Sequence, residues 1–327
     1  MANQFTDQHL KVHLRLQQAW EQDFVDAHEE QGHHGQTKLL WSNLLGLALV
    51  EQDMQQNNDC REIELVVAGA SPGTHMLVLL KHVTKWRESR GVRIHLYDPQ
   101  PLDARLKALV DQDESMCFER KPFTDQHAQH WKNREHCVVF FSDIRSRIHS
   151  QHEHMRVDES KIEGDMQTQR TWVKIMQPDY CMLKFHAPHA TRDQQSVPEI
   201  FPYLHGDLYE QGWVRLFSAE YRLFCTKRNI LQRKLKQYKT TDIERHAFWH
   251  TKHTRPSTFS VDSNEMQYDE AFATHVAHKA QRALGLDAEQ LLRAAERELN
   301  AASMQFPWPR AELSRAQALH LRMLQIL

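Results

Sequence analysis

Glycine is scarce in this sequence, and long apolar runs are absent. The chain has 10 glycines among 327 residues, about 3% where proteins average near 7%, so the placement of each glycine is informative. Apolar runs such as LLGLALV at 44–50 fall far short of the roughly 20 residues that a transmembrane helix needs. The opening MANQFTDQHL also lacks the charged and then apolar pattern of a signal peptide. We therefore expect no membrane partner.

Cysteine pairs and an excess of positive charge are missing too. The five cysteines are scattered without a C-x-x-C pair, which indicates reduced thiols in a reducing compartment, either cytosol or nucleus. The formal net charge is −2 and the isoelectric point is near 6.9, so any nucleic-acid site must be a local basic patch. With 40% hydrophobic and 26% charged residues, the composition excludes disordered and fibrous classes.

Strand-like and helix-like segments alternate through residues 62–142. Hydrophobic patterning there predicts strands at EIELVVAG, VRIHLYD and CVVFFSD, with helices at THMLVLLKHVTKWRESR and DARLKALV between them. A helix over 161–177 and the strand DYCMLKF follow, GWVRLFS and EYRLFCTK are typical of a strand pair, and LQRKLKQYK favours a basic helix. Strands that alternate with helices imply βαβ units and a mainly parallel sheet, and hence an α/β fold.

The chain is about twice as long as a typical single domain of roughly 150 residues, which allows one large domain with additions or two domains. The pattern changes after about residue 228, where helices prevail. We predict an N-terminal helical segment over 1–60 that packs on the core, an α/β core over 61–228, and a mainly helical extension of the same domain over 229–327.

The segment ELVVAGASPGTH at 64–75 carries the most information about function. An apolar strand ends in the closely spaced Gly69 and Gly73, and a helix is predicted to begin at once. Glycine permits a tight turn and the close approach of a ligand, and the next strand ends at Asp98, where a carboxylate can accept hydrogen bonds from a ribose. Pro72 departs from the dinucleotide pattern G-x-G-x-x-G, which favours another adenosyl cofactor. A plain turn and a loop-facing aspartate are the alternatives.

Five motifs resemble, in order, those of the poxvirus cap-specific mRNA (nucleoside-2′-O-)methyltransferases, a family that also provides the small stimulatory subunit of the viral poly(A) polymerase. The motifs are HHGQTKLL, GASPGTH, FFSDIRSR, CMLKFHAP and FSAEYRLF. The similarity runs from about residue 30 to the C-terminus and includes VDSNEMQYDEAF. The resemblance implies a Rossmann-like methyltransferase fold, S-adenosylmethionine as cofactor, and capped mRNA as substrate. It also implies a poly(A) polymerase catalytic subunit as heterodimer partner, and a cytoplasmic location in the viral factory or virion of a large DNA virus.

The resemblance assigns a Lys-Asp-Lys-Glu catalytic set to Lys38, Asp143, Lys184 and Glu220. Asp143 and Lys184 end predicted strands, where catalytic side chains of an α/β sheet belong. Two lysines close together disfavour each other's protonation, and partial burial acts in the same direction. A neutral Lys184 can then act toward a ribose 2′-hydroxyl as a base or an orienting acceptor, with the two carboxylates holding the lysines in place. Each of the four taken alone is more typical of a surface ion pair.

For S-adenosylmethionine, the resemblance implies contacts from residues of several segments, namely Gln36, Gly69, Gly73, Asp98, Thr124 and Arg145. Two positions depart from the family pattern. Gln100 stands where the family has an arginine, and Val67 stands where it has a tyrosine. These departures concern the contacts to the adenine and to the cofactor carboxylate.

The family stacks 7-methylguanine between two aromatic rings, where cation–π attraction favours the methylated base, and acidic residues read its donor edge. Glu244 matches one acidic position, whereas His189 replaces an aromatic residue and Thr191 an acidic one. Trp20 is the preferred stacking candidate and Phe24 the next, and for both the alternative is a core anchor of an amphipathic helix. The residues assigned to cap and RNA binding are Trp20, His186, His189, Ser218 and Glu244.

RNA beyond the cap requires phosphate contacts. We expect basic residues to flank the site, with a solvated basic helix face as the alternative for the later ones. These residues are Arg145, Arg147, Lys227, Arg228, Arg233, Lys234 and Lys236.

Histidines are numerous, with 23 in the chain. His246, His250 and His253 have helical spacing, but cysteine or carboxylate partners with the usual spacing of zinc ligands are missing nearby in the sequence. We therefore expect surface histidines and no metal.

Three functions are compatible with these features. The leading hypothesis is methylation of the 2′-oxygen of the first transcribed nucleotide of capped mRNA. The second is an RNA-binding processivity subunit of a poly(A) polymerase, alone or in addition to methyl transfer. The third, kept open because the predicted cap pocket is altered, is methyl transfer to another RNA position or to protein.

Overall fold

The computed structural model describes residues 11, 35–132, 134–149, 155–157, 161–187, 198–214, 220–232, 234–250 and 265–300. Its centre is a seven-stranded sheet with the order β3-β2-β1-β4-β7-β10-β9. The strands are β1 (Ile63–Ala68), β2 (Arg93–Tyr97), β3 (Met116–Glu119), β4 (Cys137–Ser142), β7 (Tyr180–His186), β9 (Asp207–Tyr209) and β10 (Glu220–Thr226). The strands from β3 to β7 pair in parallel, and β10 is antiparallel to both β7 and β9.

This sheet has the doubly wound arrangement, because the strand order reverses beside β1, which lies between β2 and β4. Two small antiparallel pairs accompany it. They are β5 (Arg147–His149) with β6 (Met155–Val157), and β8 (Ile200–Tyr203) with β11 (Lys236–Lys239). The predicted Rossmann-like α/β fold with flanking helices is confirmed.

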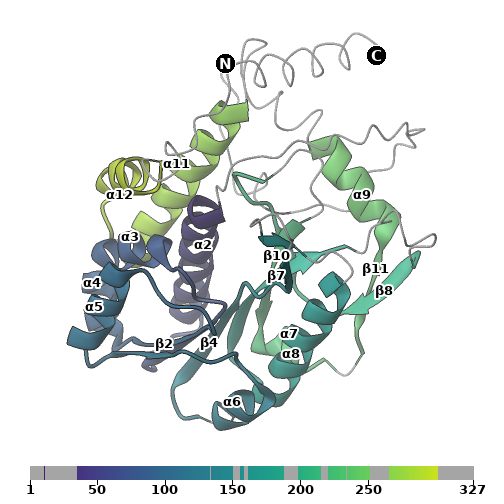
Figure 1. Ribbon diagram of the computed structural model, residues 1–327, viewed down its shortest axis with the longest axis horizontal. Coiled ribbons are helices and arrows are strands. Elements are labelled where there is room, and N and C mark those ends of the chain that lie inside the picture. Colours follow the sequence, from purple (N-terminus) through teal and green to yellow (C-terminus); the bar gives the residue numbers. More distant parts are fainter. Residues whose placement is uncertain are drawn as a thin grey trace.

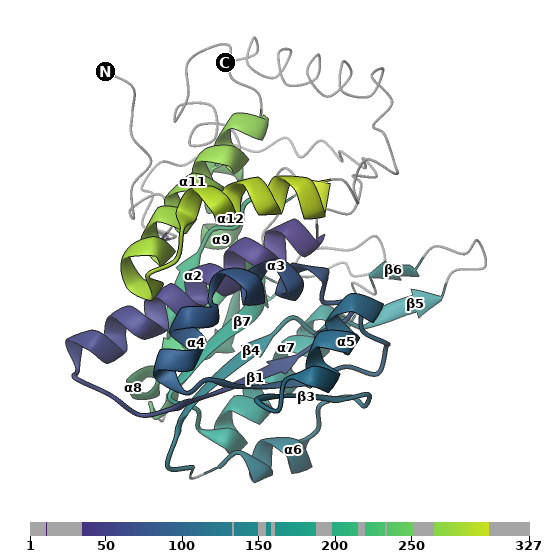
Figure 2. The ribbon, with the colours of Figure 1, turned by 90° about the vertical axis from the view of Figure 1, so that its left-hand side faces the viewer.

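Helices cover both faces of the sheet (Figure 1). One group consists of α2 (Gly35–Gln56), α3 (Thr74–His82), α4 (Thr84–Arg90), α5 (Ala104–Gln112), α11 (Glu265–Leu284), α12 (Ala288–Ala295) and the short π-helical turn η3 (Glu296–Asn300). The opposite face is covered by α6 (Asp125–His130) and α7 (Ile162–Met176), and α8 (Lys227–Ile230) and α9 (Thr240–Trp249) follow later in the chain. Figure 2 shows α11 and α12 stacked over α2 and α3, with the sheet beneath them.

The strand residues are divided between two hydrophobic cores by the two-residue period of a strand. In β1, Leu65 and Val67 pack into the core that contains α2, α3 and α11, while Val66 and Ala68 pack into the core that contains α7. Burial on both faces explains why these strands are almost wholly apolar. Helix α2 is likewise buried on most of its sides, because it packs against α3, α11 and β7. Among the described residues, no helix is long and apolar enough to cross a bilayer.

Three predicted elements differ from the structure. The single helix expected over 74–90 is two helices, which are separated at Val83. The basic segment 231–239 contains the strand β11 rather than a helix, because its residues alternate with Tyr238 buried and its neighbours exposed or half-buried. The outer partner of β10 is β9, and the described part of 212–218 is not a strand.

Candidate active site

The carboxyl ends of the parallel strands and the beginning of β10 meet at one edge of the sheet. Asp143 follows β4 directly, Lys184 lies near the end of β7, and Glu220 begins the antiparallel β10. The strand register places Arg222 directly opposite Lys184, so both belong to one side of the sheet. Lys38 comes from the first turn of α2. Four elements that are far apart in sequence thus deliver charged groups to one place.

Ion pairs join these side chains into one cluster, which we call the KDKE cluster (Lys38, Asp143, Lys184 and Glu220). Lys38 Nζ lies 2.5 Å from Glu220 Oε1. Lys184 Nζ lies 3.4 Å from Asp143 Oδ1 and 3.7 Å from Glu220 Oε2. Lys184 is therefore held between two carboxylates, one of which also pairs with the other lysine.

Two further residues, which the sequence does not predict as part of the site, hold the cluster through hydrogen bonds. The Arg222 guanidinium donates hydrogen bonds to Asp143 Oδ1 and to Gln211 Oε1, each at 2.7 Å. Gln211 Nε2 in turn donates to the Glu220 carbonyl oxygen at 3.1 Å and to Glu220 Oε1 at 3.3 Å. Because Arg222 and Gln211 are buried, they fix the orientation of both carboxylates from behind.

The electrostatics of the cluster favour ionised carboxylates and lower the pKa of one lysine. Burial, together with the positive charges of Lys38 and Arg145, lowers the pKa of Lys184 to about 8 against the opposing attraction of the two carboxylates. Burial alone would raise the pKa of Asp143, but Lys184, Arg222 and Lys38 outweigh it and hold this pKa far below its usual range. The pKa of Glu220 is lowered well below its usual value by the same cations, again against the effect of burial.

The glycine turn after β1 lies beside the cluster. Gly69 has φ +84°, and a Cβ on it would lie 3.0 Å from the backbone carbon of Asp143, so a side chain would collide with the end of β4. Gly73, with φ +76°, precedes the first turn of α3. Asp98 at the end of β2 accepts hydrogen bonds from the backbone N–H groups of Ser71 at 2.9 Å and Gln100 at 2.8 Å. Its carboxylate therefore shapes the turn.

A buried chain of hydrogen bonds ties the start of α2 to the start of α3. His75 Nδ1 donates to Gln36 Oε1 at 2.8 Å, and Asn43 Nδ2 donates to His75 Nε2 at 3.1 Å. Gln36 Oε1 also accepts from the Thr74 hydroxyl at 3.0 Å. Burial lowers the pKa of His75 to about 4, so this imidazole is neutral at pH 7. Gln36 and Lys38 thus keep a fixed position relative to the glycine turn.

Arg145 and Thr124 differ in whether their side-chain polar atoms are hydrogen-bonded within the protein. The Arg145 side chain is only 6% exposed, its Nη2 atom lies 3.8 Å from Glu220 Oε2, and neither Nη atom has a hydrogen-bond partner among the described residues. A buried guanidinium in this state can bind an anionic ligand. The Thr124 hydroxyl instead accepts a hydrogen bond from the backbone N–H of His127 and begins α6 in a capping box.

Most of the residues assigned to the cap are not placed by the structure. Trp20, Phe24, His189, Thr191 and Ser218 lie outside the described residues. His186 ends β7, and its Nδ1 lies 2.6 Å from the backbone oxygen of Ala187. Glu244 is half-buried on α9.

The expectation that Lys227 and Arg228 flank the site is wrong. They follow the far end of β10, where Thr226 pairs with Tyr180 at the beginning of β7, and Lys227 binds Asp179 there at 3.2 Å. At about 3.3 Å per residue, this end of β10 lies roughly 20 Å along the strand from Glu220.

The comparisons with known proteins give a family and likenesses to solved structures. None of the curated proteins matches this sequence. Among solved structures, bluetongue virus VP4, described as a multifunctional RNA-capping production line, is similar at 12% identity and a TM-score of 0.46, over 77% of this chain and 36% of that one. This chain thus spans about a third of the length of that protein. The family model described as poly A polymerase regulatory subunit matches residues 11–282, so the chain belongs to this family.

Proposed function

We propose that this chain transfers a methyl group from S-adenosylmethionine to the 2′-oxygen of the first transcribed nucleotide of capped mRNA. The observation that carries the proposal is the KDKE cluster, in which a buried lysine with a pKa of about 8 lies between two ionised carboxylates. The cluster lies at the carboxyl ends of the strands, beside the glycine turn, where open α/β sheets bind their ligands.

The residues around the glycine turn fit an adenosyl cofactor. The turn has positive φ at Gly69 and Gly73, a conformation that glycine adopts without strain, and it brings the turn close to the Asp143 backbone. Each Asp98 oxygen accepts one backbone hydrogen bond, so it retains acceptor capacity for ribose hydroxyls. The unsatisfied Arg145 guanidinium offers a partner for a carboxylate or a phosphate. When bound there, S-adenosylmethionine supplies an electrophilic methyl group.

Lys184 is the residue we assign to the substrate hydroxyl. In its neutral form, Nζ accepts the proton of the 2′-hydroxyl as the oxygen attacks, or orients the hydroxyl by accepting its hydrogen bond. A protonated Lys184 is then stabilised by Asp143 and Glu220 at 3.4 and 3.7 Å. Because Arg222 and Gln211 hold these carboxylates, the cluster is set before substrate binds, and much of the rate comes from positioning.

The Lys184→Ala variant tests this assignment. It removes the proton acceptor and leaves the glycine turn unchanged, so S-adenosylmethionine binding should persist while methyl transfer to a capped transcript falls by at least about 100-fold, the lower range for acid–base catalysis. The exposed Lys107 on α5 gives a matched control, and Lys107→Ala should keep full activity. Full activity of Lys184→Ala on capped RNA would overturn the assignment.

Family membership favours a second function that can coexist with the first. The match to poly A polymerase regulatory subunits over 11–282 supports a poly(A) polymerase catalytic subunit as partner and a role in extending poly(A) tails. Adding this protein to such a catalytic subunit should lengthen the tails, and Lys184→Ala should lengthen them equally, because tail extension does not use the methyl-transfer chemistry. An unchanged tail length in the presence of the wild-type chain would refute the second function.

A further inference from the structure

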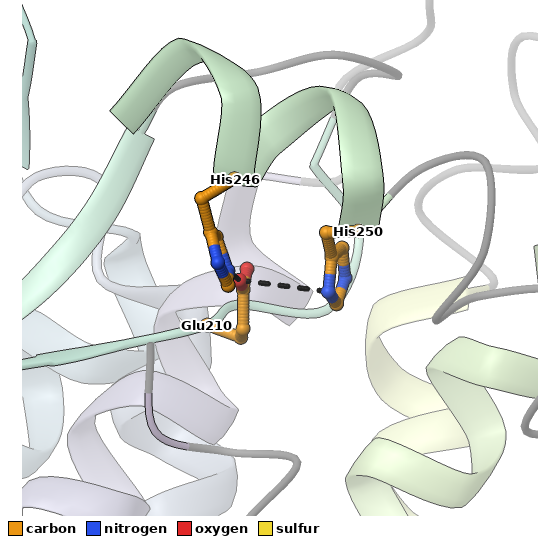
Figure 3. Close-up of side chains that lie close together, drawn as sticks. All are labelled: Glu210, His246 and His250. Carbon is orange, nitrogen blue, oxygen red and sulfur yellow. Dashed lines mark hydrogen bonds and ion pairs between the residues drawn. The ribbon is translucent and has the colours of Figure 1, made fainter. Parts of the chain in front are cut away.

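A buried cluster of metal-ligating side chains lies outside the site described above. Glu210 follows β9 directly, His246 lies on α9, and His250 follows four residues later as the C-cap of that helix, with helical backbone angles. Figure 3 shows both imidazoles facing the Glu210 carboxylate from successive turns of the helix. Side chains at positions i and i+4 of a helix share one face, so the two histidines reach the same point in space.

The distances in this cluster are short enough for common ligands of one ion. His246 Nε2 lies 2.6 Å from Glu210 Oε1, and His250 Nδ1 lies 3.5 Å from the same oxygen. One donor atom from each of the three residues lies within 4.8 Å of the others. The two imidazole rings are nearly parallel, with an angle of 24° between them and their centroids 6.1 Å apart.

Burial distinguishes this cluster from an ordinary surface group. Glu210, His246 and His250 are 4%, 9% and 5% exposed, so the expectation of surface histidines is wrong for both. The fold nevertheless supplies a carboxylate partner that is remote in the sequence, because Glu210 lies 36 positions before His246. His253, the third histidine of the series, lies outside the described residues.

A second polar group lies beside the cluster. The Tyr221 hydroxyl is buried and has no hydrogen-bond partner among the described residues, and its ring centroid lies 5.9 Å from that of His246. Unsatisfied buried polar groups are rare in proteins, and this one belongs to a ring that packs edge-on against His246.

We propose that Glu210, His246 and His250 bind one Zn²⁺ ion, with water as the fourth ligand. Two imidazole nitrogens and one carboxylate oxygen form a set that suits zinc in tetrahedral geometry. The ion would join α9 to the segment after β9. That segment continues into Gln211, which holds Glu220 and Arg222, so metal binding would rigidify the support of the KDKE cluster. The proposal does not depend on the methyl-transfer assignment.

The test uses the full chain, stripped of metal with a chelator and titrated with Zn²⁺ alone. We expect one tight ion per chain by calorimetry and elemental analysis, and a thermal midpoint that rises with Zn²⁺. His246→Ala and Glu210→Gln should each lower the affinity for that ion by on the order of 100-fold or more. Removing even a residue that only hydrogen-bonds to a metal ligand lowers metal affinity by about 10- to 100-fold. His278→Ala, which removes an exposed histidine of α11, should bind like the wild type.

A ligand-preserving variant separates loss of metal from loss of fold. With Co²⁺ as the probe, the wild type should show the strong visible absorption of tetrahedral cobalt. The variant His246→Cys should retain binding and add a thiolate-to-cobalt band, because the new ligand is in the coordination sphere. A wild type that binds Zn²⁺ only weakly and at many histidines, or a tight ion retained unchanged in His246→Ala, would overturn the proposal. The cluster would then be a hydrogen-bonded histidine–carboxylate group.

Discussion

Replacing Glu220 by glutamine should move the pH dependence of methyl transfer toward lower pH. In the wild type, Lys184 has a pKa of about 8, and Glu220 is one of two carboxylates that raise this pKa against burial and neighbouring cations. Glu220→Gln removes that negative charge and also leaves Lys38 without its 2.5 Å partner. Both changes disfavour the protonated form of Lys184, so the base becomes neutral at lower pH.

The distance between the charges sets the size of the effect. Lys184 Nζ and Glu220 Oε2 are 3.7 Å apart, which at an effective dielectric constant near 20 corresponds to about 4.5 kcal/mol, or about 3 pKa units, as an upper bound. Rearrangement of the remaining charges reduces this value. We therefore expect the midpoint of the profile to fall from about 8 to roughly 7 or below.

The assay is kcat/KM for methyl transfer to a capped transcript as a function of pH, because this quantity reports groups of the free enzyme. The activity should rise with pH in both proteins, since neutral lysine is the active form. Glu289→Gln on α12, which removes an exposed glutamate, should leave the midpoint unchanged. A midpoint in Glu220→Gln that stays near 8 or moves upward would show that Lys184 is not the titrating group.

Two other predictions concern stability. Arg222→Met removes the 2.7 Å ion pair to Asp143 and leaves Lys184, at 3.4 Å, as the nearest cation of that carboxylate. Because removing one partner of a buried pair leaves the other charge uncompensated, the free energy of unfolding measured by urea titration should fall by about 3–5 kcal/mol. A loss below about 1 kcal/mol would show that Arg222 does not stabilise the cluster. His75 has a pKa of about 4 in the folded chain against 6.5 for an ordinary histidine, so the unfolded state binds more protons below about pH 6.5 and stability decreases as the pH is lowered. This term should amount to about 2.5 kcal/mol between about pH 7.5 and 4.5, and His75→Gln should flatten that part of the stability–pH curve, whereas an unchanged slope would refute it.

The sequence predicts those parts of the site that local patterns encode. Gly69 and Asp98 follow strong apolar runs, so their places at the ends of neighbouring strands could be expected. Lys184 and Asp143 were reached in the same way, with the family resemblance selecting them among many charged residues. Local patterning works here because parallel strands buried on both faces leave a clear apolar signal.

The missed residues depend on information that no local pattern contains. Arg222 lies opposite Lys184 only through the antiparallel register of β10 and β7, and the same strand direction carries Lys227 away from the site. Gln211 and Glu210 come from the irregular segment after β9, whose position is set by tertiary packing. The sequence predicts exposed histidines at His246 and His250 because their carboxylate partner is remote in the sequence.

The central claim is that the KDKE cluster acts on a ribose 2′-hydroxyl at the capped end of mRNA. The most direct measurement compares methyl incorporation from labelled S-adenosylmethionine into three transcripts of one sequence: capped, uncapped, and capped with a 2′-deoxy first nucleotide. We expect label in the first transcript alone, located on the 2′-oxygen of the first nucleotide. Equal incorporation into the 2′-deoxy transcript, or no incorporation into capped RNA by a correctly folded wild-type chain, would contradict it.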